Sequence, residues 1–264
     1  MSDLLPSTVA ARAKADRRFD GGDPVTAFPT GNRLLDALLP ERQRIFSTEL
    51  RAVRVERDEP TQTAGTRMRY ADFPIDAVLC TSLNLSDGGR CDVETVGREG
   101  YVEIDAGLDT ENASRHSRCR IPGVVLRVKV AAFRAEMQAS ERFSVLVHRN
   151  IAARFFSVGQ YVACGSLHTI VQRSARWLLQ CNDAVGRARF PITQDVVAEA
   201  IGAQRPNVTV ALGRLREAEA IELARGVVTI ADRLRLEAET CECYADVKAA
   251  MNDALMTAPP APSS

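Results

Sequence analysis

Residues 190–230 read FPITQDVVAEAIGAQRPNVTVALGRLREAEAIELARGVVTI, and this pattern predicts two short helices separated by a tight turn. Thr193 is a good N-cap for the first helix. Gly202 marks the turn, because glycine adopts a positive φ at little steric cost. The second helix is predicted from about Gln204, with Pro206 tolerated in its first turn. The apolar residues predicted to face inward are Val196, Val197, Ala200, Val208, Ala211, Leu212 and Leu215.

Two short strands are predicted after the second helix, over 220–223 and 227–230, with a turn at Arg225-Gly226 between them. The order helix, turn, helix and hairpin is that of a winged helix-turn-helix. An exposed helix N-terminus offers N–H groups to phosphates, and the first turns of such a helix reach base edges in the major groove of DNA. Residues 204–216 contain three arginines and no acid, so this stretch is basic. The residues alone leave open a packing unit that does not bind DNA.

Upstream, apolar residues recur at steps of three and four, which is typical of one helix face. They are Phe143, Val147, Ile151, Phe155, Val158 and Val162. The stripe predicts a long helix from 131 to near 163, about eight turns if it is unbroken. A break is predicted at 164–166, before another helix that ends near Asp183. The length of the stripe favours a homodimer through the 141–163 helix, and the alternative is a helix packed on its own domain.

Residues 31–130 show alternation of period two, interrupted by turns that contain glycine or proline. This pattern predicts a compact antiparallel β domain. Within it, Asp87-Gly88-Gly89 predicts a hairpin turn. The side chains predicted to face inward are Val53, Val55, Ala77, Leu79, Thr81, Leu83, Leu85, Cys91, Val93, Val124, Leu126, Val128 and Val130. Polar residues between them, Asp92, Glu94, Arg127 and Lys129 among them, are predicted to face outward.

The composition is that of a globular protein. Of the 264 residues, 45% are hydrophobic and 26% charged, which allows a sizeable core and excludes wholesale disorder. The 34 basic and 34 acidic residues give a formal net charge of zero. This excludes a strongly basic nucleic-acid wrapper and a polyacidic binder, but not a local basic face. No apolar run approaches a membrane span and no signal-type segment begins the chain, so we expect a cytoplasmic protein without a membrane partner.

Seven cysteines are scattered along the chain, at 80, 91, 119, 164, 181, 241 and 243. No CxxC pair occurs, so neither a metal site nor a cofactor is predicted, and free thiols are expected in a reducing compartment. Cys91 and Cys119 share the parity of apolar neighbours, which predicts buried core thiols. Cys80 has the opposite parity, which predicts greater exposure.

Cys241-Glu242-Cys243 is predicted to lie in an extra helix after the wing. Residues i and i+2 of a helix point about 200° apart, so these thiols cannot bind one ion unless the helix unwinds. A redox switch is one interpretation of the pair. The favoured interpretation is a capping helix that packs Leu234, Leu236, Cys241 and Tyr244 on the wing domain.

The sequence resembles the Crp/Fnr superfamily of bacterial transcription regulators. The matching pieces are FPITQDVVAEAIGAQRPNVTVALGRL, the wing RGVVTIADR, MRYADFP, the DGGR hairpin with VETVGREGYV, and IPGVVLRV. The resemblance runs from about 31 to about 250. It implies an α+β fold, with an N-terminal antiparallel β-roll of the cyclic-nucleotide-binding, jelly-roll-like type, a long dimerisation helix and a C-terminal winged helix-turn-helix. Short catalytic motifs are missing from the sequence, so an enzyme is not predicted.

With this resemblance, the chain divides into five predicted segments. Residues 1–30 and 256–264 are expected to be flexible tails. The β-roll is expected at 31–130, and the dimerisation helix with its hinge at 131–166. The winged helix-turn-helix domain, with an extra C-terminal helix, is expected at 167–255.

The resemblance implies a homodimer that binds double-stranded DNA at a palindromic operator, with RNA polymerase as a further candidate partner. The residues at DNA-contacting positions are Thr193, Gln194, Arg205, Pro206, Asn207, Thr209, Val210 and Arg214. Pro206 and Val210 stand where the best-known members have Glu, Arg or Ser, so DNA shape is expected to carry more of the specificity. Two alternatives are a helix-turn-helix that no longer binds DNA, in an interaction protein, and a cysteine-based redox-responsive regulator.

The resemblance also implies an effector pocket in the β-roll. Cyclic-nucleotide members hold the phosphate in a Gly-Glu turn, whereas Glu103 and Ile104 stand at that place here. Arg115-His116 is the closest remnant of the arginine pair that follows, so Glu103, Arg115 and His116 are the candidate effector residues. We therefore expect a degenerate pocket for an unidentified small molecule, or for none, rather than for a cyclic nucleotide. The chain has no cysteine before Cys80, which excludes the N-terminal iron–sulfur cluster of some members.

Overall fold

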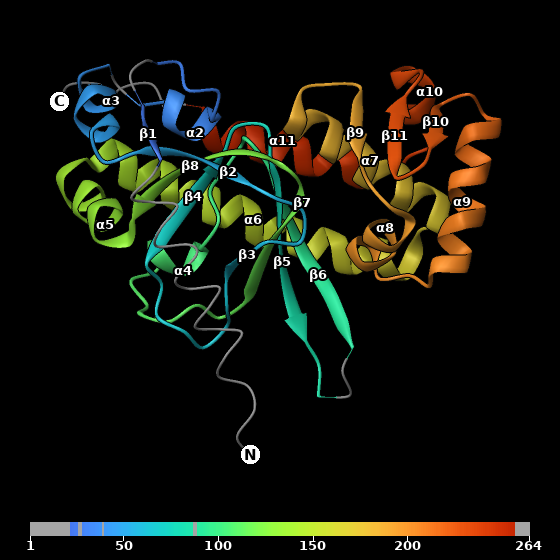
Figure 1. Ribbon diagram of the computed structural model, residues 1–264, viewed down its shortest axis with the longest axis horizontal. Helices are drawn as coiled ribbons and strands as arrows, with labels where there is room; N and C mark the ends of the chain where they lie inside the picture. Colours follow the sequence, from blue (N-terminus) through green and yellow to red (C-terminus); the bar gives the residue numbers. More distant parts are fainter. Residues whose placement is uncertain (1–21, 26–27, 39, 87–88, 257–264) are drawn as a thin grey trace, which may run out of the picture.

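The computed structural model describes residues 22–25, 28–38, 40–86 and 89–256. Within these residues, two four-stranded antiparallel sheets form an N-terminal β domain, and a long helix connects it to a C-terminal domain built around a three-stranded sheet (Figure 1). This arrangement confirms the predicted α+β fold. No helix in the described part of the chain is long and apolar enough to cross a membrane.

The sheets of the β domain have the strand orders β1-β2-β8-β4 and β3-β7-β5-β6. The strands are β1 Asp23–Pro24, β2 Arg51–Val55, β3 Pro60–Gln62, β4 Tyr70–Pro74, β5 Val78–Asn84, β6 Arg90–Val96, β7 His116–Ile121 and β8 Gly123–Lys129. Short helices in the same domain are α2 Arg33–Asp36, α3 Pro40–Ser47 and α4 Ile104–Gly107. Residues 23–24, expected in the N-terminal tail, form an edge strand on β2 instead. The predicted turn residues 87–88 lie outside the described residues, as do 257–264 of the predicted C-terminal tail.

Aromatic rings in tilted and edge-to-face contact hold the start of the long helix against the β domain. The ring centroids of Tyr101 and Phe133 are 5.0 Å apart, and those of Phe133 and Phe143 are 5.2 Å apart. Phe133 lies on α5 (Val130–Ala139) and Phe143 on α6 (Glu141–Leu167). Because aromatic side chains bury large apolar areas, these contacts fix the start of α6 on the sheets.

The predicted inward face of β6 is wrong. The alternation places Cys91 in the core, whereas Cys91 is exposed and Asp92 and Glu94 are buried. Burial alternates along β6 as predicted, but the buried side chains are Asp92, Glu94 and Val96, the parity opposite to the predicted one. Both acids pair with buried arginines, which offsets the cost of burying a carboxylate.

Other exposures in the β domain also differ from the prediction. Cys80, predicted to be more exposed, is fully buried, because α7 (Ile170–Val185) covers the second face of β5. Leu83 and Leu85, predicted to face inward, are exposed beyond that covered part. Arg127, predicted to face outward, is buried and pairs with the Asp72 carboxylate at 2.7 Å. Cys119 is buried as predicted.

The long helix differs from the prediction at both ends. It is broken at Ser140, whose backbone is extended and whose hydroxyl accepts a hydrogen bond from the Phe143 N–H at 3.2 Å. The helix break predicted at 164–166 does not occur, since α6 continues to Leu167. A single glycine at 165 is tolerated inside a helix, at a cost of about 1 kcal/mol relative to alanine.

The predicted apolar stripe of α6 divides between two environments. Phe143 and Val147 are buried against the β domain. Phe155 is 82% exposed and Val162 68% exposed. Other exposed apolar side chains on this helix are Val145, Phe156 and Leu167. The far half of the helix therefore presents apolar surface that this chain does not cover.

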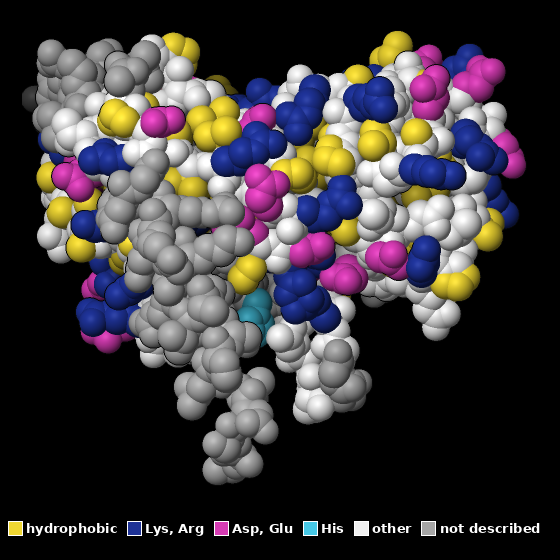
Figure 2. Space-filling view, in the orientation of Figure 1, with side chains coloured by type: hydrophobic (Ala, Val, Ile, Leu, Met, Phe, Trp, Pro, Cys, Tyr) yellow, Lys and Arg dark blue, Asp and Glu magenta, His cyan; other side chains and the backbone are white. Residues whose placement is uncertain are grey.

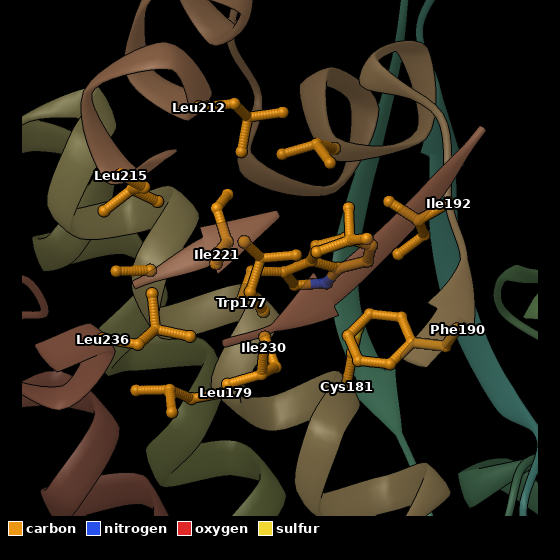
Figure 3. Packing of buried hydrophobic residues seen from close by; sticks show 14 of the residues in the cluster. Trp177, Leu179, Cys181, Phe190, Ile192, Leu212, Leu215, Ile221, Ile230 and Leu236 are labelled. Carbon is orange, nitrogen blue, oxygen red and sulfur yellow. The ribbon is translucent and has the colours of Figure 1, made fainter. Parts of the chain in front are cut away.

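The C-terminal domain has the predicted winged helix-turn-helix order. Its elements after α7 are β9 Arg189–Pro191, α8 Gln194–Ile201, α9 Arg205–Glu217, β10 Ile221–Ala224, β11 Val227–Ile230, α10 Arg233–Ala238 and α11 Cys243–Leu255. Trp177 of α7 lies in its core, among Phe190, Ile221 and Ile230 (Figure 3). The inward side chains predicted for α8 and α9 are buried, with Ala200 partly so.

The last helix, α11, leaves the C-terminal domain and packs along α6 (Figure 1). Near its end, Leu255 joins the core of the β domain, and Asn252 accepts a hydrogen bond from Arg33 at 2.9 Å. At its start, Tyr244 belongs to the core of the C-terminal domain. The helix thus connects both domains, in contrast to the predicted capping helix on the wing domain alone.

Candidate nucleic-acid interface and effector region

Helices α8 and α9 begin where the sequence predicts, and the turn between them lies at the predicted glycine. The Thr193 side chain accepts a hydrogen bond from the Val196 N–H at 3.4 Å and caps α8. Gly202 has φ +60°, the left-handed conformation that favours glycine. Helix α9 begins at Arg205, with Pro206 in its first turn. The local sequence therefore sets the geometry of both helices.

The outer face of α9 is open. Its predicted contact residues Arg205, Pro206, Asn207, Thr209, Val210 and Arg214 are all exposed. Val210 is 60% exposed, so its methyl groups are available for contact with a partner. Helix α9 lies at the right edge of the molecule in Figure 1, away from the β domain.

Contacts between α8 and α9 bring four of the predicted residues to one end of the motif. The Thr209 hydroxyl donates to Gln194 Oε1 at 2.7 Å, and Gln194 follows the cap residue Thr193. Arg205 Nε lies 3.2 Å from Asp195 Oδ1. Arg214 lies more than two turns further along α9 and does not join this group. The grouped side chains present donors and acceptors beside the N-terminus of α9.

Sequence reasoning missed two residues at this end. One is Asp195, which pairs with Arg205. The sequence does show this acid in the first turn of α8, where a negative charge interacts favourably with the helix dipole. Arg225 is exposed in the turn between β10 and β11. That turn lies beside the cap residue, because the Ile192 N–H donates to the Gly226 carbonyl at 2.9 Å. The wing therefore adds a cation next to the two helices.

Charges of both signs are interspersed over the face shown in Figure 2, so no single basic patch dominates it. The local basic stretch comes from α9, where Arg205, Arg214 and Arg216 are exposed. The pair between Arg205 and Asp195 is itself largely exposed, and such a pair is worth only about 0–1 kcal/mol. A stronger anion therefore competes readily for the Arg205 guanidinium.

A buried arginine joins the β domain to α8. Arg120 of β7 donates to both oxygens of the Asp92 carboxylate, from Nε at 2.9 Å and from Nη2 at 2.8 Å. Its Nη2 also donates to Glu199 Oε2 of α8 at 2.6 Å. Burial alone would lower the pKa of Arg120, but the Asp92 carboxylate raises it. Val78 and Ile121 continue this contact into the core of the C-terminal domain. The helix-turn-helix is thus seated directly on the β domain.

The predicted effector residues lie in the β domain, but they do not form one open site. Glu103 is buried with φ +77°, and its Oε1 accepts a hydrogen bond from the Ser117 hydroxyl at 2.7 Å. Arg115 Nη1 lies 3.8 Å from Glu94 Oε2. His116 Nδ1 accepts a hydrogen bond from the Ala64 N–H at 3.4 Å, and partial burial lowers the pKa of this histidine.

The interior beside these residues holds an ion pair that sequence reasoning missed. Arg154 of α6 is 2% exposed, and its Nη2 donates to Glu94 Oε2 at 2.7 Å. Its Nη1 donates to the Tyr101 carbonyl at 2.6 Å. Nothing in the sequence indicated that Arg154 is buried, because charged residues of an amphipathic helix are expected on its solvent-facing side. The charges of Arg154 and Glu94 therefore neutralise each other in the part of the β domain where the resemblance places an effector phosphate.

Replacing Glu103 with glutamine should change how stability depends on pH. Burial raises the pKa of Glu103 from 4.5 to about 8. Between these values the native state holds a proton that the unfolded chain releases, so the free energy of unfolding falls as pH rises, by at most about 1.4 kcal/mol per pH unit. Urea unfolding should show Glu103→Gln gaining on the wild type from pH 5 to pH 8.

The exposed Glu111→Gln variant is the control, and it should follow the wild type at every pH. Parallel curves for Glu103→Gln and the wild type would show that the native state does not hold this proton.

A cavity of about 270 Å³ lies at the junction of the two domains. The β domain contributes Arg98 and Glu99, α6 contributes Tyr161, α7 contributes Asp183 and α11 contributes Lys248. A change in the angle between the domains would change its shape.

The fold and the open helix pair define a class, a β-roll joined by a long helix to a winged helix-turn-helix. Residues 172–239 match the model of the Crp-like helix-turn-helix domain family. No curated protein matches the chain.

Several solved structures share the fold. FixK2 from Bradyrhizobium japonicum is 14% identical, with 73% of this chain and 98% of that chain covered and a TM-score of 0.60. A CRP-family transcriptional regulator from Thermus thermophilus is 23% identical, with 70% and 95% covered and a TM-score of 0.58. A putative Crp/Fnr-family regulator from Eubacterium rectale is 17% identical, with 80% and 97% covered and a TM-score of 0.56. Residues 172–239 therefore form a Crp-like helix-turn-helix domain, and the chain shares its fold with these regulators.

Proposed function

We propose that the protein is a homodimeric transcription regulator that binds DNA in a sequence-specific manner through α9. The observation that carries this proposal is the open outer face of α9, which has a basic stretch and an uncovered N-terminal end. Its inner face is fixed by the buried Val208, Leu212 and Leu215. A rigidly backed helix with an open outer face suits insertion into the major groove.

We assign the contacts by chemistry. Arg205 is the candidate for a bidentate contact to guanine, which requires that it leave Asp195. Val210 suits the methyl group of thymine. Thr193, Gln194 and the wing residue Arg225 suit phosphate contacts. Pro206, Asn207, Thr209 and Arg214 complete the proposed surface, and they shape its fit to the groove.

The exposed apolar surface of α6 supports the homodimer. Phe155 and Val162 are seven residues apart, so they lie on one face of the helix. A second copy of the same helix would cover them across a two-fold axis. Two copies of α9 would then be available for two half-sites, which favours a palindromic operator.

An effector other than a cyclic nucleotide fits the β domain better. The buried pair between Arg154 and Glu94 leaves neither charge available to a ligand. Arg115 faces the same carboxylate, and the Glu103 side chain is buried and bonded to the Ser117 hydroxyl. We therefore propose that the β domain does not bind a cyclic nucleotide.

Selection of bound sequences from random duplex DNA tests the proposed function. The wild type should enrich a palindrome, and Arg205→Ala should weaken binding to it by about 1–3 kcal/mol, roughly five- to 150-fold. Arg54→Ala, which removes an exposed arginine from β2, is the matched control and should bind like the wild type. Equal loss for both variants, or no enrichment by a folded wild type, would contradict DNA reading by α9.

A further inference from the structure

Four metal-ligating side chains meet where α6 ends and α11 begins. Cys164 lies near the end of α6, and His168 follows that helix directly. Cys243 is the first residue of α11, and Cys241 lies two residues before it. The three sulfur atoms and one imidazole nitrogen all lie within 4.8 Å of one another. All three thiols are buried and His168 is half-buried, so the group is largely shielded from solvent.

The backbone makes this meeting possible, because only one cysteine of the pair is helical. Helix α11 begins at Cys243, and Cys241 lies in the preceding turn. The prediction that both cysteines lie in one helix is wrong, so the separation of about 200° between residues i and i+2 of a helix does not apply to them. The turn between α10 and α11 brings Cys241 to the same side as Cys243.

The distances fit the edges of a tetrahedral zinc site. Zinc–sulfur and zinc–nitrogen bonds of about 2.3 and 2.0–2.1 Å give sulfur–sulfur edges of about 3.8 Å and sulfur–nitrogen edges of about 3.6 Å. The Sγ atoms of Cys164 and Cys241 are 3.6 Å apart. Cys243 Sγ lies 3.6 Å from His168 Nδ1. An ion at the centre would therefore require only small side-chain movements.

The surroundings also differ from those of a core cysteine. Cys119 and Cys181 pack among aliphatic side chains of the two domains, whereas Cys164, Cys241 and Cys243 form a cluster of their own. His168 directs Nδ1 toward the thiols, and its Nε2 lies 3.3 Å from the Glu242 carboxylate. A carboxylate behind a histidine fixes the ring orientation in many zinc sites.

We propose that Cys164, His168, Cys241 and Cys243 bind one structural zinc ion that fastens α11 to the end of α6. Three thiolates and one imidazole form a closed ligand set of the structural type, with no position left for a reacting water. Soft sulfur ligands in tetrahedral geometry favour zinc over magnesium or calcium. Glu242 is a positioning residue that acts through His168. The proposal does not rest on DNA binding.

Metal analysis of the full-length protein tests the site. Protein purified without chelator should contain one zinc ion per chain. The metal-free protein, loaded with cobalt(II), should show thiolate charge-transfer absorption and the intense visible bands of tetrahedral cobalt. Cys243→Ser should lose the zinc and weaken the charge-transfer band. Cys91→Ser removes an exposed thiol outside the cluster, and this matched control should keep both signals.

Two further variants separate a metal site from a merely structural contact. Cys243→His replaces one ligand by another, so it should keep zinc while the charge-transfer band falls. Glu242→Gln should keep the fold and lower zinc affinity about tenfold or more. These readouts are independent of DNA binding, so a failure here leaves the proposed function untouched.

Four results would overturn the proposal. The first is a folded wild type that holds no zinc and gives no thiolate band with cobalt. The second is iron with inorganic sulfide in the protein, which would indicate a cluster instead. The third is a disulfide between Cys164 and Cys241 in the metal-free native protein. The fourth is a Cys243→Ser variant that retains a full complement of zinc.

Discussion

Arg154→Met is expected to lower the free energy of unfolding by about 3–5 kcal/mol. The substitution leaves the Glu94 carboxylate buried, with its close partner removed. Methionine has a similar length, so most of the packing is kept and the loss reports the missing charge. Urea unfolding followed by circular dichroism measures the effect.

Two companion variants sharpen this measurement. Arg54→Met removes an arginine from an exposed pair with Glu56 and should cost less than about 1 kcal/mol. Arg154→Met combined with Glu94→Gln removes both charges and should recover much of the loss. A loss below about 1 kcal/mol for Arg154→Met alone would mean that water reaches Glu94 in solution.

Phe155→Glu is expected to convert the proposed homodimer into monomers. Because a two-fold interface contains each residue twice, a loss of about 2 kcal/mol per side chain becomes about 4 kcal/mol, roughly a thousandfold in the dissociation constant. The charge would lie in the apolar contact that the exposed face of α6 provides. Sedimentation equilibrium over a range of concentrations measures the shift.

Leu234→Glu is the matched control for this experiment. Leu234 is 77% exposed on α10, which follows the wing strand β11, so the variant should keep the oligomeric state of the wild type. Dissociation of both variants alike, or of neither, would place the interface elsewhere on the chain.

The helix-turn-helix is the part of the molecule that local sequence predicts best. The cap at Thr193, the left-handed Gly202 and the early proline of α9 each act over a few residues. Its exposed face follows from helical spacing, as the open positions of Arg205 and Val210 show. Each of these features depends on neighbours in the sequence, so no tertiary information was needed.

The features that the sequence did not predict depend on distant partners. Glu94 and Arg154 are 60 residues apart and are buried only because they pair. The period of two along β6 is readable from the sequence, but its buried parity is set by the distant arginines that pair with Asp92 and Glu94. The cysteine and histidine cluster joins residues 164 and 241, and it forms only because α11 returns along α6.

The most direct test of the central claim is a change in half-site spacing. The measurement compares the affinity of the wild type for its selected palindrome and for the same duplex with about five base pairs inserted at the centre, half a helical turn. If two copies of α9 in one dimer read the two half-sites, the insertion places them on opposite faces of the DNA and most of the specific affinity is lost. Unchanged affinity for the inserted duplex would contradict a dimer that reads both half-sites together.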